Sequence, residues 1–217
     1  MNRTSLVVTP LWAKTIAFLS VVLGLLVCST PVLAQGNNVL KVEEDWELVL
    51  TEPDVLTVAP QVTTTMSPNT HLNGTYWTFE INHLTAPAFS PGGVHLHQWN
   101  GESRQSTYSR ADRAVMHTLN ETMTWTQSLH SLNGNMIFEV RNGASTTWGT
   151  FGFGNFKLTT PWNSTHLNNY SPDVSVANAG IGFAANRVAS LKLKRVRVTY
   201  STGQTLTDET ERVVFQQ

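Results

Sequence analysis

Apolar and polar residues alternate along most of the chain beyond an apolar run near its N-terminus. Alternation with a period of two places every second side chain on the same face of an extended strand. In EDWELVLT, residues 44–51, Trp46, Leu48 and Leu50 would share one buried face. The pattern recurs in YWTFEINH, ETMTWTQSL and NMIFEVRNG, and each of these segments predicts a strand with one face in a core.

Turn signals separate these strands at short intervals. They are Asn73-Gly74, Pro91-Gly92-Gly93, Asn100-Gly101, Asn133-Gly134, Asn142-Gly143 and Thr202-Gly203. Short strands with such turns predict an all-β, single-domain antiparallel β-sandwich. The turn at Asn133-Gly134 lies between two alternating runs and therefore predicts a hairpin.

Two segments depart from simple alternation. The apolar residues of ASLKLKRVRVTY are odd-numbered up to Leu193 and even-numbered from Val196, which predicts a β-bulge near Lys194-Arg195. The segment SRADRAVMHTL, residues 109–119, is the one stretch whose pattern would also suit a short helix.

Residues 1–34 are predicted to be a signal peptide. Arg3 and Lys14 supply positive charge, and Thr15 to Cys28 is an apolar run of 14 residues. A membrane-spanning helix needs about 18 or more, and small side chains up to Ala34 suit a signal peptidase. We expect cleavage after Ala34 and a protein that is secreted or held in the periplasm or cell envelope, with no membrane span after cleavage. A retained membrane anchor and a lipidated Cys28 are the alternatives.

The mature chain is predicted to hold an N-terminal extension, residues 35–42, and the sandwich domain, residues 43–217. Cys28 is the only cysteine, so cleavage leaves none for thiol catalysis or metal binding. The mature part has 12 basic and 15 acidic residues, a formal charge of 12 − 15 = −3. Nucleic-acid binding needs clustered basic residues and is not expected. We interpret the basic residues 192–197 as a solvated strand face and the acidic residues 43–54 as a solvated edge.

Three segments carry a resemblance to a known fold family: YWTFEIN, NMIFEVRNGASTTWGTFG and AGIGFAANRVASLKLKRVRVTY. In order and pattern they resemble concanavalin A-like, or laminin G-like, jelly rolls, over about Asp45 to Tyr200. The resemblance implies a jelly-roll sandwich. It implies little about function, because one fold hosts many activities.

A pair of histidines lies in the stretch SPGGVHLHQWNGES, residues 90–103. On a strand, His95 and His97 point to the same side as Trp99, and two rings at this spacing can converge on one metal ion. Such a site needs at least one more ligand, for which His83 or Glu80 are the candidates. Those two belong to opposite faces of their strand, so at most one of them would join. The alternative is a polar strand face without metal, and no cofactor is expected.

Hydrolysis of glycosidic bonds requires two carboxylates across the sugar bond. Glu80 and Glu139 each stand alone on their strands, so this chemistry would need them to meet in space. Motifs for serine nucleophiles, zinc proteases, dinucleotides and phosphate loops are missing from the sequence.

Tryptophan rings stack on the apolar faces of sugars, so exposed ones indicate a possible glycan surface. Trp77 and Trp125 lie in apolar rows and are predicted to be core, whereas Trp99, Trp148 and Trp162 are candidates for an exposed platform. The leading hypothesis is a non-catalytic module that binds carbohydrate or another cell-envelope component through Trp99, His95 and His97 on a concave sheet face. A structural envelope protein is the second, and a metal-dependent enzyme or glycoside hydrolase using His95, His97 and Glu80 or His83 is the third.

Overall fold

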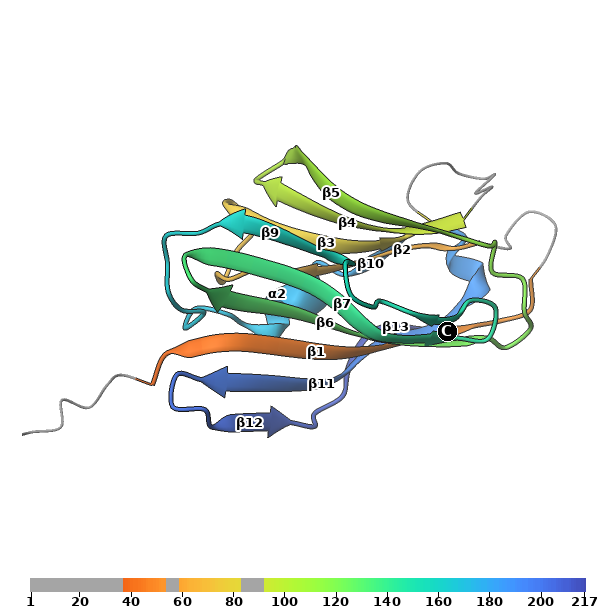
Figure 1. Ribbon diagram of the computed structural model, residues 1–217. Helices are drawn as coiled ribbons and strands as arrows, with labels where there is room; N and C mark the ends of the chain where they lie inside the picture. Colours follow the sequence, from red (N-terminus) through yellow and green to blue (C-terminus); the bar gives the residue numbers. More distant parts are fainter. Residues whose placement is uncertain (1–36, 54–58, 83–91) are drawn as a thin grey trace, which may run out of the picture. The chain divides into compact units, whose positions relative to one another are not determined.

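Two antiparallel β-sheets pack face to face in the computed structural model, which describes residues 37–53, 59–82 and 92–217 (Figure 1). The predicted all-β sandwich is therefore confirmed. Residues 1–36 lie outside the described residues, so the signal peptide and its cleavage after Ala34 stay predictions. The helices in the described part of the chain are too short or too polar to cross a membrane.

The larger sheet has eight strands within the described residues. Its order is β12 (Thr205–Asp208), β11 (Val188–Tyr200), β1 (Val39–Leu50), β6 (Thr122–Leu132), β7 (Asn135–Ser145) and β8 (Gly149–Phe151). In addition, β13 (Arg212–Gln216) pairs with β11, and β9 (Lys157–Pro161) pairs with β7.

The smaller sheet has five strands in the same part of the chain. Its order is β10 (Gly180–Phe183), β2 (Gln61–Met66), β3 (Thr75–Ile81), β4 (Gly92–Asn100) and β5 (Ser103–Arg113). Two short helices, α2 (Pro172–Ala177) and the 3₁₀ turn η1 (Ala185–Arg187), lie in the connections on either side of β10.

Aromatic rings join the two sheets at the centre of the core. Trp46 on β1 and Trp125 on β6 are cross-strand partners whose rings stack at 6.3 Å, and both are buried. Phe79 of the smaller sheet contacts Trp125 at 5.3 Å between ring centroids. Large buried rings contribute much of the apolar area that drives folding. Trp77 and Trp125 are core residues, as the alternation predicts.

The predicted hairpin and the predicted bulge are both present. Asn133 and Gly134 have φ values of 50° and 73°, the left-handed conformation of a two-residue turn between β6 and β7. In the β1–β11 pairing, Asp45 faces Arg195 whereas Trp46 faces Leu193. Lys194 is therefore the extra residue, and the shift lets both halves of β11 keep their apolar side chains inward.

The boundaries of the sandwich differ from those predicted. β1 begins at Val39 and Val42 is fully buried, so residues 39–42 belong to the domain and not to an N-terminal extension of residues 35–42. The reason is that β1 pairs on both sides, with β11 and with β6. The segment 109–119 forms no helix, because Ser109 to Arg113 continue β5 along β4.

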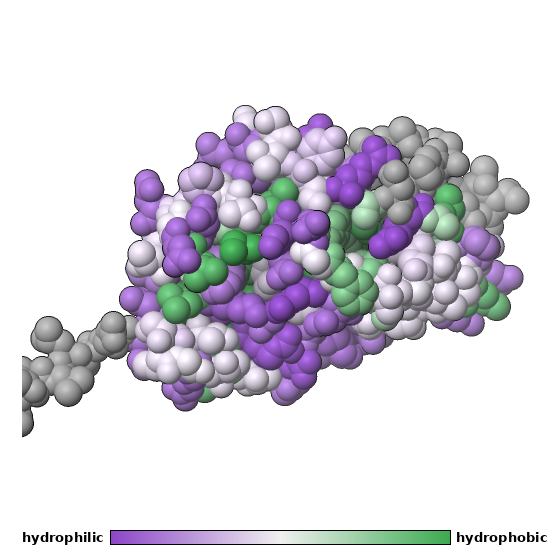
Figure 2. All heavy atoms as spheres, in the orientation of Figure 1, coloured by the Kyte–Doolittle hydropathy of each residue, from purple (hydrophilic) through white to green (hydrophobic). Residues whose placement is uncertain are grey.

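The acidic residues of β1 do not form a solvated edge, since β1 lies inside the larger sheet. Glu43 and Asp45 point outward. Both form ion pairs with Arg197 on the neighbouring strand β11, and Glu43 also pairs with Arg141 on β7, which lies beyond β6. Figure 2 shows hydrophilic side chains gathered over β1, β6 and β7. The basic residues of β11 therefore lie on a strand face, as predicted, but one that is largely neutralised by acidic partners.

Glu44 points the other way and is fully buried between the sheets. It accepts hydrogen bonds from Trp46 Nε1 at 2.9 Å, Gln127 Nε2 at 2.7 Å and Tyr170 Oη at 2.6 Å. Gln127 in turn accepts a hydrogen bond from Thr64 of the smaller sheet, so this polar cluster links both sheets. Burial raises the pKa of Glu44, and the hydrogen bonds offset only part of that effect.

The raised pKa of Glu44 predicts that the protein becomes less stable as the pH rises. The Glu44 carboxyl binds its proton more tightly in the folded state than in the unfolded state. Its contribution to the stability of the fold is therefore fully present below the unfolded pKa, and it is lost as the pH rises through the folded pKa. In Glu44→Gln, the amide can still accept from Trp46 and Gln127 and donate to Tyr170 Oη. We expect the free energy of unfolding of this variant, measured with urea, to depend less on pH than that of the wild type. At pH 8 it should be higher than that of the wild type by on the order of 1–3 kcal/mol. Glu47→Gln, on the outer face of the same strand, is the control. It should leave the pH dependence of the free energy of unfolding as it is in the wild type.

Asp45 predicts the opposite pH dependence. Burial acts to raise its pKa, but hydrogen bonds from Arg197, Thr126 and Arg195 outweigh burial and lower it. Its stabilising contribution is therefore present above the unfolded pKa and lost as pH falls through the folded pKa. We expect Asp45→Asn to lower the free energy of unfolding by about 1–2 kcal/mol at pH 7. The difference from the wild type should shrink towards pH 3, and a constant difference across the range would contradict the ion-pair explanation.

Candidate functional site

The outer face of the smaller sheet carries the histidine pair. Val94 and Leu96 of β4 are buried in the core, so His95, His97 and Trp99 must point away from the larger sheet. The three side chains therefore share one face of the strand, as their spacing predicts. Although they point outward, both histidines are only 3% exposed, so the face is covered by its own side chains and its neighbours.

The strand register places a row of polar and aromatic side chains beside the histidines. On β3, Glu80 pairs with His95 and Thr78 pairs with His97. On the other side of β4, the register sets the β5 residues Arg110 and Tyr108 opposite the same two histidines, and Arg104 opposite Trp99.

A chain of polar contacts runs across this face from β4 to β3. Trp99 Nε1 donates to Thr78 Oγ1 at 3.0 Å, and the Thr78 hydroxyl donates to Glu80 Oε1 at 2.8 Å. The other carboxylate oxygen of Glu80 lies 3.6 Å from His97 Nε2. Glu80 is 3% exposed, so its carboxylate is shielded from solvent and lies between the Thr78 hydroxyl and the His97 imidazole.

Of the four residues predicted as metal ligands, the structure brings three to one face. Glu80 lies beside His97, and the ring centroids of His95 and His97 are 5.6 Å apart. His83 lies outside the described residues. Across the described parts of the chain, no three His, Cys, Asp or Glu side chains are grouped closely enough to hold a metal ion. The metal site therefore stays a prediction, without a ligand set on the residues that the structure describes.

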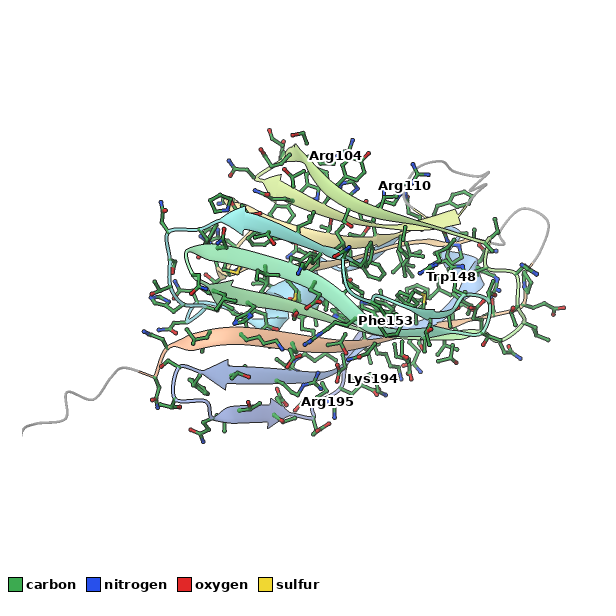
Figure 3. The ribbon with its side chains drawn as sticks, in the orientation of Figure 1. Arg104, Arg110, Trp148, Phe153, Lys194 and Arg195 are labelled. Carbon is green, nitrogen blue, oxygen red and sulfur yellow. The ribbon has the colours of Figure 1, made fainter. Side chains whose placement is uncertain are left out.

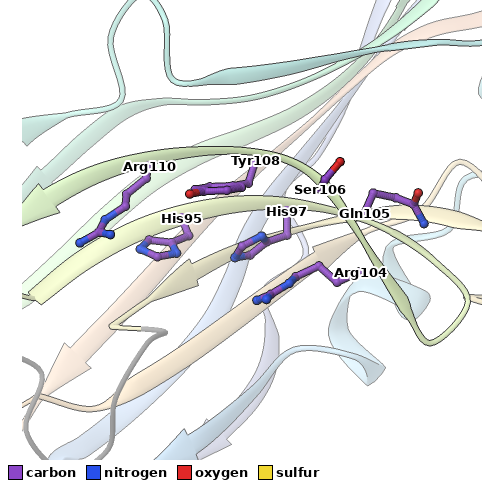
Figure 4. A pocket seen from close by; sticks show the side chains of 7 residues that line it. All are labelled: His95, His97, Arg104, Gln105, Ser106, Tyr108 and Arg110. Atoms are coloured by element: carbon purple, nitrogen blue, oxygen red, sulfur yellow. The ribbon is translucent and has the colours of Figure 1, made fainter.

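Two pockets open on this face. The first, called here the arginine pocket, has a volume of ≈ 300 Å³ and is lined by His95, His97, Arg104, Gln105, Ser106, Tyr108 and Arg110 (Figure 4). The second, called here the threonine pocket, has a volume of ≈ 350 Å³ and is lined by Gln61, Thr63, Thr65, Leu72, Tyr76, Thr78, Glu80, Trp99 and Asn178. The two are neighbours, because Glu80 of the second contacts His97 of the first.

Aromatic rings mark the boundary between the pockets. Trp99 stacks on Tyr76 at 6.2 Å with an angle of 4° between the rings, and it meets His97 edge-on at 6.4 Å. Tyr108 is 56% exposed, and its ring lies 5.6 Å from that of His97. Stacking and the hydrogen bond to Thr78 together fix the position of the Trp99 indole.

Trp148 and Trp162 do not join Trp99 in one platform. Trp162 packs edge-on against the core residue Trp77 at 5.9 Å. Trp148 packs against Phe151 at 5.7 Å and donates to the carbonyl of Ala114. Both are half-buried at the margin of the core, and their role as ligand-stacking residues stays a prediction. Figure 3 shows Trp148 well apart from Arg104 and Arg110.

Sequence reasoning missed the contribution of β5, which supplies Arg104, Tyr108 and Arg110. This strand has no alternating apolar face, because its side chains are mostly exposed at the edge of the smaller sheet. The two carboxylates considered for glycoside hydrolysis do not meet. Glu139 lies on β7, where its neighbours Phe138 and Val140 are buried, so it faces outward from the opposite sheet.

Comparisons with known proteins leave the family open. No protein family model matches the chain, and no curated protein matches it. One similar solved structure is a Scytalido-glutamic peptidase with a peptide-based transition state analog, at 9% identity and a TM-score of 0.29. The alignment covers 82% of this chain and 83% of the peptidase chain. A TM-score this low does not establish a shared fold, and nothing about function is taken from it.

Proposed function

We propose that this protein is a non-catalytic binding module for carbohydrate, exported from the cytoplasm, and that its binding surface is the outer face of the smaller sheet. The observation that carries the proposal is the position of Trp99. Its indole is only partly buried, is held by Tyr76 and Thr78, and lies beside two polar pockets.

The chemistry of this face suits a sugar ring. A pyranose has an apolar face of C–H groups and a rim of hydroxyls, so it needs a flat ring together with hydrogen-bond donors and acceptors. Trp99 supplies the flat ring, and a rigid aromatic loses little conformational entropy on binding. The threonine pocket supplies the polar partners: hydroxyls of Thr63 and Thr65, amide groups of Gln61 and Asn178, and the Glu80 carboxylate.

The size of the pockets supports the same proposal. Ligand sites have volumes of about 300–1,000 Å³, and each of these pockets is near the lower limit. Together they would cover one or two sugar units. A concanavalin A-like jelly roll, the signal peptide and a location outside the cytoplasm belong to the same proposal, since a glycan-binding module meets its ligand there.

The first test is glycan binding by the mature chain and by Trp99→Ala. We expect the wild type to bind members of an oligosaccharide array, and the variant to lose at least tenfold in affinity by calorimetry, because the stacking ring is gone. Phe153→Ala is the matched control, since Phe153 is an exposed aromatic residue that lines neither pocket. Absence of binding to every glycan by a folded wild type would contradict the proposal and favour a structural envelope protein.

One observation favours a second candidate, a hydrolytic enzyme. The Glu80 carboxylate lies 3.6 Å from the His97 ring in a protected position, and such a pair can orient an imidazole for proton transfer. Metal chemistry on His95, His97 and Glu80 belongs to the same candidate.

Binding and hydrolysis are separated by following the bound glycans over time. For a binding module we expect unchanged oligosaccharides after long incubation, by chromatography, with or without added Zn²⁺. Shorter products that disappear in both Glu80→Gln and His97→Gln would replace the proposal with the enzyme. Products that persist in these variants would point to a contaminating activity and leave the binding module in place.

A further inference from the structure

We propose that the glycan bound by this face is acidic, and that its carboxylate or sulfate group is held in the arginine pocket by Arg104 and Arg110. The inference rests on the proposed function and adds the chemical class of the ligand. It also predicts the orientation of the bound glycan, whose charged group would lie over β4 and β5 and whose hydroxyls would lie towards β2.

Among the described residues that line the arginine pocket, the charged side chains are cations. Arg104 and Arg110 contribute two guanidinium groups, His95 and His97 contribute two imidazoles, and Tyr108 contributes a phenol hydroxyl. No carboxylate is among the described residues that line this pocket. Arginine presents a planar fork of N–H donors that matches the oxygens of carboxylate and sulfate groups, so this lining suits an anion.

The two arginines lie at opposite ends of the histidine pair. Arg110 is the cross-strand partner of His95, whereas Arg104 is the partner of Trp99 beyond His97. Figure 4 shows the Arg110 guanidinium beside the His95 ring and the Arg104 guanidinium beside the His97 ring, with Tyr108 along the row between them. An anionic group placed over the histidines would therefore meet a cation from each side.

The Glu80 carboxylate limits where an anion can lie. It belongs to the threonine pocket on β3, and β4 with its two histidines lies between it and β5. An acidic group over β3 would be repelled by this carboxylate, whereas one over β5 would be attracted by the arginines. The sugar ring would then stack on Trp99 between them, with its neutral hydroxyls in the threonine pocket.

The test compares oligosaccharides that differ only in charge. Oligogalacturonate, oligomannuronate and oligoglucuronate are each titrated against the mature protein beside their methyl esters. We expect at least one acid to bind ten times or more tightly than its ester in dilute buffer, and added salt to reduce this ratio. Arg104→Gln and Arg110→Gln should each bring the ratio towards one while affinity for the ester is kept. Lys157→Gln removes one exposed positive charge from the larger sheet and should keep the full ratio.

A second readout does not depend on the glycan. Inorganic sulfate should shift the ring resonances of His95 and His97 in NMR spectra of the wild type, and the Arg104→Gln/Arg110→Gln double variant should lose these shifts. Equal binding of acids and esters would overturn the inference and leave the glycan proposal standing. Sulfate shifts without binding of any glycan would keep the anion site and overturn the glycan proposal. Neither response in a folded protein would overturn both.

Discussion

The inward packing of β3 and β4 decides what the outer face of the smaller sheet can present. Trp77, Phe79 and Ile81 of β3 are fully buried, as are Val94 and Leu96 of β4. Each strand must therefore turn its alternate residues outward, and the pairing of β3 with β4 sets Glu80 and Thr78 beside the histidines. A shift of one residue in either strand would move these groups into the core, so the packing of the core fixes which residues the outer face presents.

Buried polar groups complement the apolar core in a chain whose described part has no cysteine. Glu44, Gln127 and Thr64 connect the two sheets by hydrogen bonds, and such a network is satisfied only when both sheets are in register. The outer face of the larger sheet works differently. Its acidic and basic residues neutralise one another across β1 and β11, and the result is a solvated surface with little net charge.

Alternation in the sequence was enough to predict the parts of the fold that depend on local pattern. The strands around Trp46, Phe79 and Trp125, the turn at Asn133-Gly134 and the bulge near Lys194 all follow from it. Alternation could not predict which strands, distant in the sequence, pair with one another. Only the partners of β1 show that Glu43 and Asp45 form ion pairs while Glu44 is buried, although the three are consecutive. In the same way the histidines and Glu80 could be named as candidates, but β5 has no buried face and gave no signal for Arg104 and Arg110.

The position of β5 at the edge of the smaller sheet has a consequence for association between copies of the chain. Within the described residues, β5 pairs only with β4, so one side of its backbone has no partner strand. Unpaired edges invite pairing between molecules, and charged side chains along them oppose it, since two such edges repel one another. Arg104, Arg110 and Arg113 place three cations along this one strand. Arg104 and Arg110, which would recognise a ligand, would therefore also oppose edge-to-edge pairing of two sheets.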